Sequence, residues 1–370
     1  MKKIAIIGAG AVGATLAYYL SKEKDIQVTV FDYGVGQATK AAAGIISPWF
    51  SKRRNKAWYR MARLGADFYS KLVTDLQKDG FETKFYQQTG VFLLKKDESQ
   101  LESLFALADK RRLESPLIGD LQILNKSEAN THFPELDGYE QLLYASGGAR
   151  VEGADLTRIL LEASGVNVIK DEVHFTITDN GFRVQGIDFD KLVLASGAWL
   201  AKILDEHNYQ VDIRPQKGQL RDYYFSNINT GKYPVVMPEG ELDIIPFDNG
   251  KVSVGASHEN DMAFDLNIDF KVLDKFEEQA IGYFPQLKKA DTTSERVGIR
   301  AYTSDFSPFF GPVPCMEGAY AASGLGSTGL TVGPLIGYEL CQLILNKENQ
   351  LNLEDYDITK YVKRLVDDSV

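Results

Sequence analysis

The sequence predicts an α/β protein in which a domain with a parallel sheet is joined to a second unit built mainly from antiparallel strands. Two observations carry this prediction. Residues 4–32 have the pattern of a strand, a glycine turn, a helix and a second strand. Between residues 219 and 255, short β-like runs alternate with turns, which is typical of an antiparallel sheet. The chain has 370 residues, enough for two such units with their own cores.

The first stretch reads IAIIGAGAVGATLAYYLSKEKDIQVTVFD from Ile4 to Asp32. Gly8 permits a tight turn, Gly10 lets the backbone approach a pyrophosphate, and Gly13 lets the helix lie close to the strand. The free N–H groups at the start of the helix would bind the phosphates. Asp32 follows the glycines by about 20 residues and is placed to accept hydrogen bonds from a ribose diol. The pattern therefore predicts a bound dinucleotide in a Rossmann-type domain. The alternative is a glycine turn with a purely structural role.

Composition excludes several classes of function. The chain has 41 basic and 51 acidic residues, a net charge of −10, and no long run of one sign. Nucleic acids and anionic membrane surfaces both favour clustered Lys and Arg, so neither is expected as the main partner. Cys315 and Cys341 are too few for a disulfide framework, and the four histidines show no metal-ligand spacing, so no metal site is expected.

The sequence also indicates the cellular compartment. No apolar segment reaches the roughly 18 residues of a membrane span. The first predicted strand begins at the N-terminus, so no signal peptide is expected before it. We therefore expect a soluble, cytoplasmic protein.

Further elements follow from hydrophobic periodicity. Helices are expected over residues 55–76, 98–113 and 155–163, and Asp269 is expected to cap another. Strands are expected over residues 90–94 and 142–145, over 166–175 paired with 181–185, and over 219–225, 242–247 and 251–255. The strand at 191–194 ends on small residues, as expected beneath a nucleotide, although a simple buried strand would look alike.

Two segments near the C-terminus contain residues suited to ligand binding or catalysis. Residues 297–308 place one arginine, Arg300, in a strand that ends in a turn. Residues 319–331 form a strand and a glycine-rich loop, and Pro334 suits the first turn of a helix that runs to about residue 345. This second glycine turn offers N–H groups to a polar edge or to developing negative charge.

The motifs GAGAVG, FDYG, ATKAAAGII, LVLASGAW, GIRAYTSDFSP and SGLGSTGLTVGP, in this order, resemble the D-amino-acid oxidase family of FAD-dependent oxidoreductases. Within it the chain is most similar to the branch of glycine oxidase, D-amino-acid dehydrogenase and sarcosine oxidase. The resemblance implies an FAD-binding domain assembled from residues 1–80, 146–212 and 299–370. A substrate domain with a large, mainly antiparallel sheet would comprise residues 81–145 and 213–298.

The resemblance also assigns residues to the cofactor. The pyrophosphate would contact Gly8, Gly10, Ala11, Val12 and Gly13, and the adenosine ribose would contact Asp32, where glutamate is usual. The remaining positions expected along the FAD are Tyr33, Thr39, Lys40, Gly44, Ile45, Ile46, Val173, Ser196, Gly197, Leu325, Gly326, Ser327, Thr328, Gly329, Leu330 and Thr331. The helix expected to start near Leu335 would stabilise the anionic reduced ring. The FAD is expected to be non-covalent, because Cys315 lies beyond the turn where some relatives attach it.

Arg300 matches the family arginine that binds the substrate carboxylate, a task that suits a bidentate guanidinium. The alternative role for Arg300 is a surface or interdomain ion pair. In this family, hydride passes from the substrate α-carbon to flavin N5 and gives an imino acid. No protein base is needed if the amine arrives neutral.

Three positions depart from the family. Asp243 stands where glycine oxidases have a tyrosine that reaches the substrate carboxylate, and an anion there would repel a second carboxylate and attract an amine. Ser327 replaces a second basic residue of some relatives. His258 is a candidate to face the pocket and to titrate near neutral pH. Each of the three has an equally weighted alternative in which it lies outside the pocket.

The resulting prediction is an FAD enzyme that oxidises a small amine, a D-amino acid, glycine or an N-substituted glycine, to the imine. The alternatives are an FAD-dependent 2-hydroxy acid oxidoreductase, a nicotinamide-dependent dehydrogenase and a non-catalytic flavin-binding protein. The segments 38–46 and 324–331 argue against a nicotinamide enzyme, which needs neither. The sequence does not decide whether the electron acceptor is oxygen or another compound, or whether the protein is a monomer or a homo-oligomer.

Overall fold

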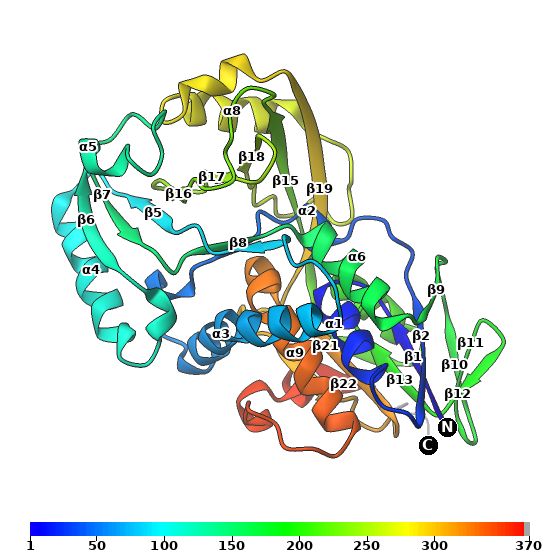
Figure 1. Ribbon diagram of the computed structural model, residues 1–370. Helices are drawn as coiled ribbons and strands as arrows, with labels where there is room; N and C mark the ends of the chain where they lie inside the picture. The colour runs from blue at the N-terminus through cyan, green and yellow to red at the C-terminus, as the bar shows by residue number, and fades with distance from the viewer. Residues whose placement is uncertain (366–370) are drawn as a thin grey trace.

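A computed structural model describes residues 1–365 of the chain, which form two large sheets with helices around them (Figure 1). Residues 366–370, the last of the expected FAD-binding domain, lie outside the described residues. The predicted α/β class is confirmed: one large sheet is mainly parallel and the other is mainly antiparallel.

The first sheet has six strands, and all neighbours in it are parallel except β20, which is antiparallel to β21. Its strands, in spatial order, are β20 (Phe309–Pro312), β21 (Ala319–Ser323), β13 (Lys191–Leu194), β1 (Lys2–Ile7), β2 (Ile26–Phe31) and β9 (Asn167–Ile169). Strand β1 is buried on both faces, because Ile4 and Ile6 join one core while Ala5 and Ile7 join another.

Helices cover one face of this sheet, and small β elements cover the other. The helical face carries α1 (Ala11–Leu20), α3 (Lys56–Lys78), α6 (Gly153–Ser164) and α9 (Gly329–Ile344). The opposite face carries β10 (Phe175–Thr178), β11 (Gly181–Val184), β12 (Ile187–Phe189), α7 (Leu200–Asp205) and the pair β14 (Tyr209–Val211) and β22 (Val362–Arg364).

The second sheet has eight strands, and all its neighbours are antiparallel except β16 and β5. Its strands, in spatial order, are β19 (Thr292–Tyr302), β15 (Arg214–Tyr224), β18 (Lys251–Gly255), β17 (Asp243–Pro246), β16 (Val235–Met237), β5 (Val91–Leu94), β7 (Gln141–Ala145) and β6 (Leu121–Asn125). The helices beside it are α4 (Glu98–Arg112), α5 (Lys126–Ala129) and α8 (Phe270–Ile281).

Short elements connect the two sheets. These are α2 (Ala38–Ala41) and a three-stranded sheet of β3 (Ile45–Ile46), β8 (Ala149–Val151) and β4 (Tyr86–Gln87). Strand β8 lies between the two large sheets in Figure 1. Residues 36–46 therefore lead directly from the parallel sheet toward the antiparallel one.

Two helices begin at side-chain caps, one of which was predicted. Asn55 precedes α3, and its side chain accepts a hydrogen bond from the Trp58 N–H at 3.0 Å. Asp269 caps α8 as predicted, because its side chain accepts from the Lys271 N–H at 2.9 Å.

Two expectations about elements are wrong. Residues 166–175 do not form one strand, because β9 joins the parallel sheet and only β10 pairs with β11. Helix α9 begins at Gly329, so Pro334 lies in its second turn and not in its first. The proline cannot donate to the Leu330 carbonyl, which instead accepts from the Tyr69 hydroxyl at 2.6 Å. The tyrosine thus supplies the hydrogen bond that the helix itself lacks.

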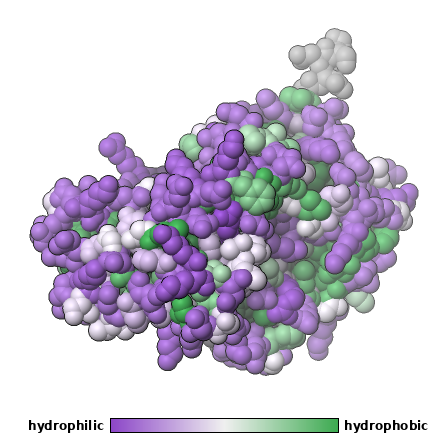
Figure 2. All heavy atoms as spheres, turned by 90° about the horizontal axis from the view of Figure 1, so that it is seen from above, coloured by the Kyte–Doolittle hydropathy of each residue, from purple (hydrophilic) through white to green (hydrophobic). Residues whose placement is uncertain are grey.

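Within residues 1–365, no helix is both long enough and apolar enough to cross a bilayer. From the side shown in Figure 2, the surface is mainly hydrophilic and its apolar side chains are scattered in small groups.

Candidate active site

One cavity of about 830 Å³ extends from the turn after β1 to the face of the eight-stranded sheet. Its volume is in the upper part of the range for cofactor and small-molecule sites. It brings together most of the predicted site residues. These are Gly8, Gly10, Ala11, Val12, Asp32, Tyr33, Thr39, Gly44, Ile45, Val173, Ser196, Gly197, Asp243, His258, Arg300 and the whole loop Leu325–Thr331.

Three predicted residues do not line the cavity, each for a local reason. Ile46 is fully buried in the core, because successive side chains of β3 point to opposite faces and Ile45 takes the cavity side. Lys40 is exposed on α2. Gly13 lies in α1 against the glycine turn, where an added Cβ would be 1.9 Å from the Gly8 carbonyl oxygen. Gly13 therefore serves the packing of the helix, as its spacing predicted.

The dinucleotide end is built by the turn after β1. Gly8 has φ +106°, and an added Cβ would stand 2.3 Å from the carbonyl oxygen of Ala195 after β13. Only glycine fits this turn, so two strand ends can meet beneath a ligand. The Asp32 carboxylate accepts from the Ala9 N–H at 2.5 Å and from the Gln37 side chain at 2.6 and 2.7 Å. Its expected contact with a ribose stays a prediction.

The residues at this end fit FAD. The first-turn N–H groups of α1 and α9 have no intrahelical acceptor. That of Ala11 donates to the Thr39 hydroxyl at 3.0 Å, whereas Val12 and Gly329–Thr331 line the cavity. Because α9 starts six residues before the expected Leu335, its first turn is itself part of the cavity wall. Within residues 1–365, the Ser196 hydroxyl and the side-chain amide oxygen of Gln37 are buried without a hydrogen-bond partner, as polar atoms that serve a ligand would be.

Arg300 on β19 presents a guanidinium to the cavity. Its Nη1 donates to the Ser257 carbonyl at 2.7 Å and to the Gln216 side chain at 3.2 Å. Among residues 1–365, Nε and Nη2 have no hydrogen-bond partner and no carboxylate lies within 4.0 Å. Burial lowers the pKa of Arg300 from its usual value. The side chain thus keeps one edge with two donors free, which is the geometry that a bidentate carboxylate requires.

A glycine beneath Arg300 makes room for it. An added Cβ at Gly218 on β15 would lie 2.5 Å from Nη1 and 2.7 Å from Nη2 of Arg300. Any side chain there would displace the guanidinium. No local pattern in the sequence identifies Gly218, because its contact with Arg300 depends on the pairing of β15 with β19.

Asp243 and His258 line the same cavity. Burial raises the pKa of Asp243 to about 8, and its carboxyl has no hydrogen-bond partner among the described residues. His258 Nδ1 lies 3.4 Å from the Glu241 carboxylate. Burial first, and then the charge of Arg300, lowers the pKa of His258, so its ring is mainly neutral at pH 7 and the expected titration near neutral pH moves to lower pH.

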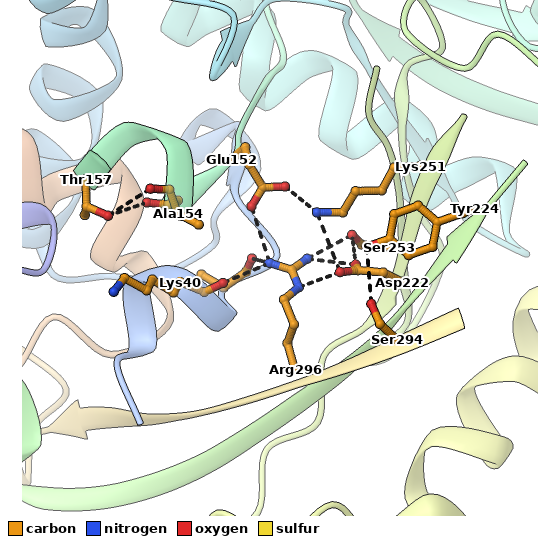
Figure 3. Close-up of polar contacts among 12 residues, drawn as sticks. Lys40, Glu152, Ala154, Thr157, Asp222, Tyr224, Lys251, Ser253, Ser294 and Arg296 are labelled. Carbon is orange, nitrogen blue, oxygen red and sulfur yellow. Dashed lines mark hydrogen bonds and ion pairs between the residues drawn. The ribbon is translucent and has the colours of Figure 1, made fainter. Parts of the chain in front are cut away.

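A charged network anchors β19 to the cofactor end, as Figure 3 shows. Arg296 lies four residues before Arg300 on the same face of β19. Its guanidinium is 2.8 Å from the buried Asp222 carboxylate, donates to the Ser253 hydroxyl at 2.9 Å, and donates to the Lys40 carbonyl at 3.1 Å. Arg296 therefore joins the eight-stranded sheet to the segment that carries Thr39.

Two acids balance this network. Glu152, just before α6, lies 3.6 Å from Arg296 and also pairs with Lys251 on β18. Lys251 in turn lies 3.6 Å from Asp222. The four charged groups come from residues up to 144 positions apart in sequence, so nothing in the sequence marks them as a unit.

Removing the central cation should destabilise the fold. We expect Arg296→Met to lower the free energy of unfolding by about 3–5 kcal/mol, because it removes the cation nearest to the buried Asp222 carboxylate. Thermal and urea unfolding of the purified protein measure this. The matched control, Arg183→Met, breaks the exposed pair with Asp188 and should cost about 1 kcal/mol or less. Equal effects of the two variants would contradict the anchoring role.

Asp243 should make stability depend on pH. Its folded pKa is raised, so the native state binds more protons than the unfolded state between about pH 4 and 8, and stability falls as pH rises through that window. We expect Asp243→Asn to raise the melting temperature, with a gain that widens from pH 5 to pH 8. Melting curves of both proteins across that range test this. A constant difference at all pH values would argue against a shielded carboxyl.

Comparison with known proteins agrees with this cavity. The family described as DAO, FAD dependent oxidoreductase, matches residues 3–343. An uncharacterised oxidoreductase, YurR, from Bacillus subtilis is 40% identical over 96% of this chain and 98% of its own. Glycine oxidase from Pseudomonas putida is 27% identical over 90% of this chain and 92% of its own.

Solved structures agree as well. Iminodiacetate oxidase from Chelativorans sp. BNC1 superposes with a TM-score of 0.90 at 31% identity, over 95% of this chain and 98% of its own. Glycine oxidase from Geobacillus kaustophilus superposes with a TM-score of 0.84 at 22% identity, over 98% of this chain and 100% of its own, and shows the shared fold. The chain therefore belongs to the DAO family and is an FAD-dependent oxidoreductase.

Proposed function

We propose that this enzyme oxidises a small amine that carries a carboxylate, of the D-amino acid, glycine or N-substituted glycine type, to the imino acid. The observation that carries the proposal is the free edge of Arg300, a cation in the cavity with two unused donors and, among residues 1–365, no carboxylate within 4.0 Å. A buried cation without a partner is costly, so an anionic ligand is its natural complement.

The cofactor and the chain would divide the chemistry. FAD, when bound, accepts a hydride equivalent from the substrate α-carbon. The chain holds the carboxylate on Arg300, and that anchor orients the α-carbon. The loop Leu325–Thr331 and the first turn of α9 would offer N–H groups and a helix N-terminus to negative charge on the bound cofactor.

The names of two relatives support the substrate class. They are a glycine oxidase and an iminodiacetate oxidase. Glycine and iminodiacetate both carry a nitrogen and a carboxylate on one carbon, which is the arrangement that the Arg300 cavity would accept. A 2-hydroxy acid presents the same carboxylate, so the proposal must be tested with both kinds of donor.

We also propose that residues 1–80, 146–212 and 299–370 form the FAD-binding domain, and that residues 81–145 and 213–298 form the substrate domain. The strands of the two large sheets support this division, since only β19 crosses one of its boundaries. Non-covalent FAD is supported by the cysteines, because neither Cys315 nor Cys341 lines the cavity. Both thiols are free, which supports a reducing compartment such as the cytoplasm. The proposal includes oxygen or another electron acceptor.

Substitution of Arg300 tests the proposal. When amine donors are mixed with the enzyme without oxygen, we expect the flavin absorption of the wild type to bleach with glycine, sarcosine, D-alanine or iminodiacetate, and not with lactate. For Arg300→Met, the donor concentration for half-maximal bleaching should rise about 30-fold or more, the equivalent of about 2 kcal/mol. Arg300→Lys should fall between the two, because it keeps the charge but loses the bidentate edge.

The control is Arg158→Met, which removes an exposed arginine on α6 and should leave bleaching unchanged. All variants should retain the FAD spectrum. Bleaching of Arg300→Met at wild-type donor concentrations would refute the assignment of the carboxylate to Arg300.

A further inference from the structure

We propose that Asp243 binds the amino nitrogen of the substrate and thereby selects amines over 2-hydroxy acids. This inference rests on the proposed function and adds to it the residue that recognises the second polar group of the substrate.

The strand register places Asp243 near Arg300. Asp243 begins β17 and pairs with Gly255 of β18. Two residues after Gly255, the Ser257 carbonyl accepts the hydrogen bond from Arg300 Nη1 at 2.7 Å. Gly255 in turn pairs with Leu220 of β15, two residues from the Gly218 that lies beneath the Arg300 guanidinium. Asp243 and Arg300 both line the same cavity, so we infer that Asp243 faces the other end of a small amino acid held by Arg300.

The surroundings of Asp243 provide no partner for its charge. In the part of the chain that the structure describes, its carboxyl forms no hydrogen bond and no ion pair. The neighbouring strand β16 contributes Met237 to the cavity wall, and Ala256 follows β18, and both are apolar. A carboxyl in such a place is costly unless a ligand satisfies it.

An ammonium group satisfies Asp243 better than a hydroxyl does. It brings a positive charge and N–H donors, and hydrogen bonds between charged groups are about twice as strong as neutral ones. A hydroxyl brings one donor and no charge. The raised pKa of Asp243 agrees with this, because an arriving cation would favour its ionised form.

Other charged groups of the cavity are arranged differently. His258 already lies beside Glu241. In the proposed function, Arg300 binds the substrate carboxylate. Besides Asp243, the titratable residues that line the cavity on the side of the eight-stranded sheet are Arg300, His258, Lys95 and Lys52. Glu241 pairs with His258. Within residues 1–365, Asp243 is therefore the acidic residue that lines the cavity on that side.

Three matched ligands that cannot lose hydride from an α-carbon test the inference. They are 2-aminoisobutyrate, 2-hydroxyisobutyrate and pivalate, which differ only in an ammonium, hydroxyl or methyl group beside the carboxylate. Each is titrated into the holoenzyme, and its dissociation constant is read from the change in the flavin absorption spectrum. For the wild type at pH 8, we expect 2-aminoisobutyrate to bind about 10-fold or more tightly than the other two.

In Asp243→Asn we expect this advantage to disappear. Binding of 2-aminoisobutyrate should weaken about 10-fold or more, while binding of the other two should change by less than about 3-fold. Asp243→Glu keeps the charge and should retain part of the preference. In the wild type, affinity for 2-aminoisobutyrate should also improve from pH 6 to pH 8 as Asp243 ionises, and in Asp243→Asn it should not.

Two results would overturn the inference. One is an Asp243→Asn enzyme that still prefers 2-aminoisobutyrate, and the other is an equal loss of affinity for all three ligands, which would indicate a change of cavity shape alone. Arg300→Met separates this inference from the proposed function. If that variant binds all three ligands as the wild type does, the carboxylate site is misplaced, whatever Asp243 does.

Discussion

The close contact between β19 and residues 36–42 is the constraint on which the site depends. The Ile299 N–H donates to the Gly36 carbonyl at 3.0 Å, and an added Cβ at Gly298 would stand 2.8 Å from the Ala41 side chain. Arg296 reinforces this contact from the same strand. One strand therefore carries both the anchor to residues 36–42 and Arg300, so the distance between that segment and Arg300 is fixed.

Among residues 1–365, Arg300 and Asp243 are two charged residues of the cavity wall whose hydrogen-bonding capacity the chain does not fill. Arg300 has an unused donor edge, and Asp243 has no partner. Elsewhere the same sheet pairs its buried charges fully, as the network of Arg296, Asp222, Lys251 and Glu152 shows. This contrast supports the proposal that Arg300 and Asp243 serve a ligand.

The parts of this account that sequence could predict are local or belong to a recognisable motif. The glycine turn, the acid at the end of β2 and the loop before α9 each lie within a few residues of a strand end. Resemblance pointed to Arg300 and Asp243, His258 was a further candidate, and all three line the cavity. The same resemblance treated residues 44–46 as one lining segment, but the alternation of strand side chains turns Ile46 into the core.

What sequence could not predict depends on pairing between distant segments. Gly218 beneath Arg300, the free donor edge and the Arg296 network all require the register of β15, β18 and β19. The start of α9 was misplaced because Pro334 suggested a first turn, whereas Tyr69, more than 260 residues earlier, makes a proline acceptable in the second turn.

The most direct test of the central claim is a crystal structure of the holoenzyme with 2-aminoisobutyrate bound. We expect the ligand carboxylate to accept two hydrogen bonds from the free edge of Arg300, with its nitrogen within hydrogen-bond distance of Asp243. A carboxylate bound elsewhere, with Arg300 still bonded only to Ser257 and Gln216, would contradict the account.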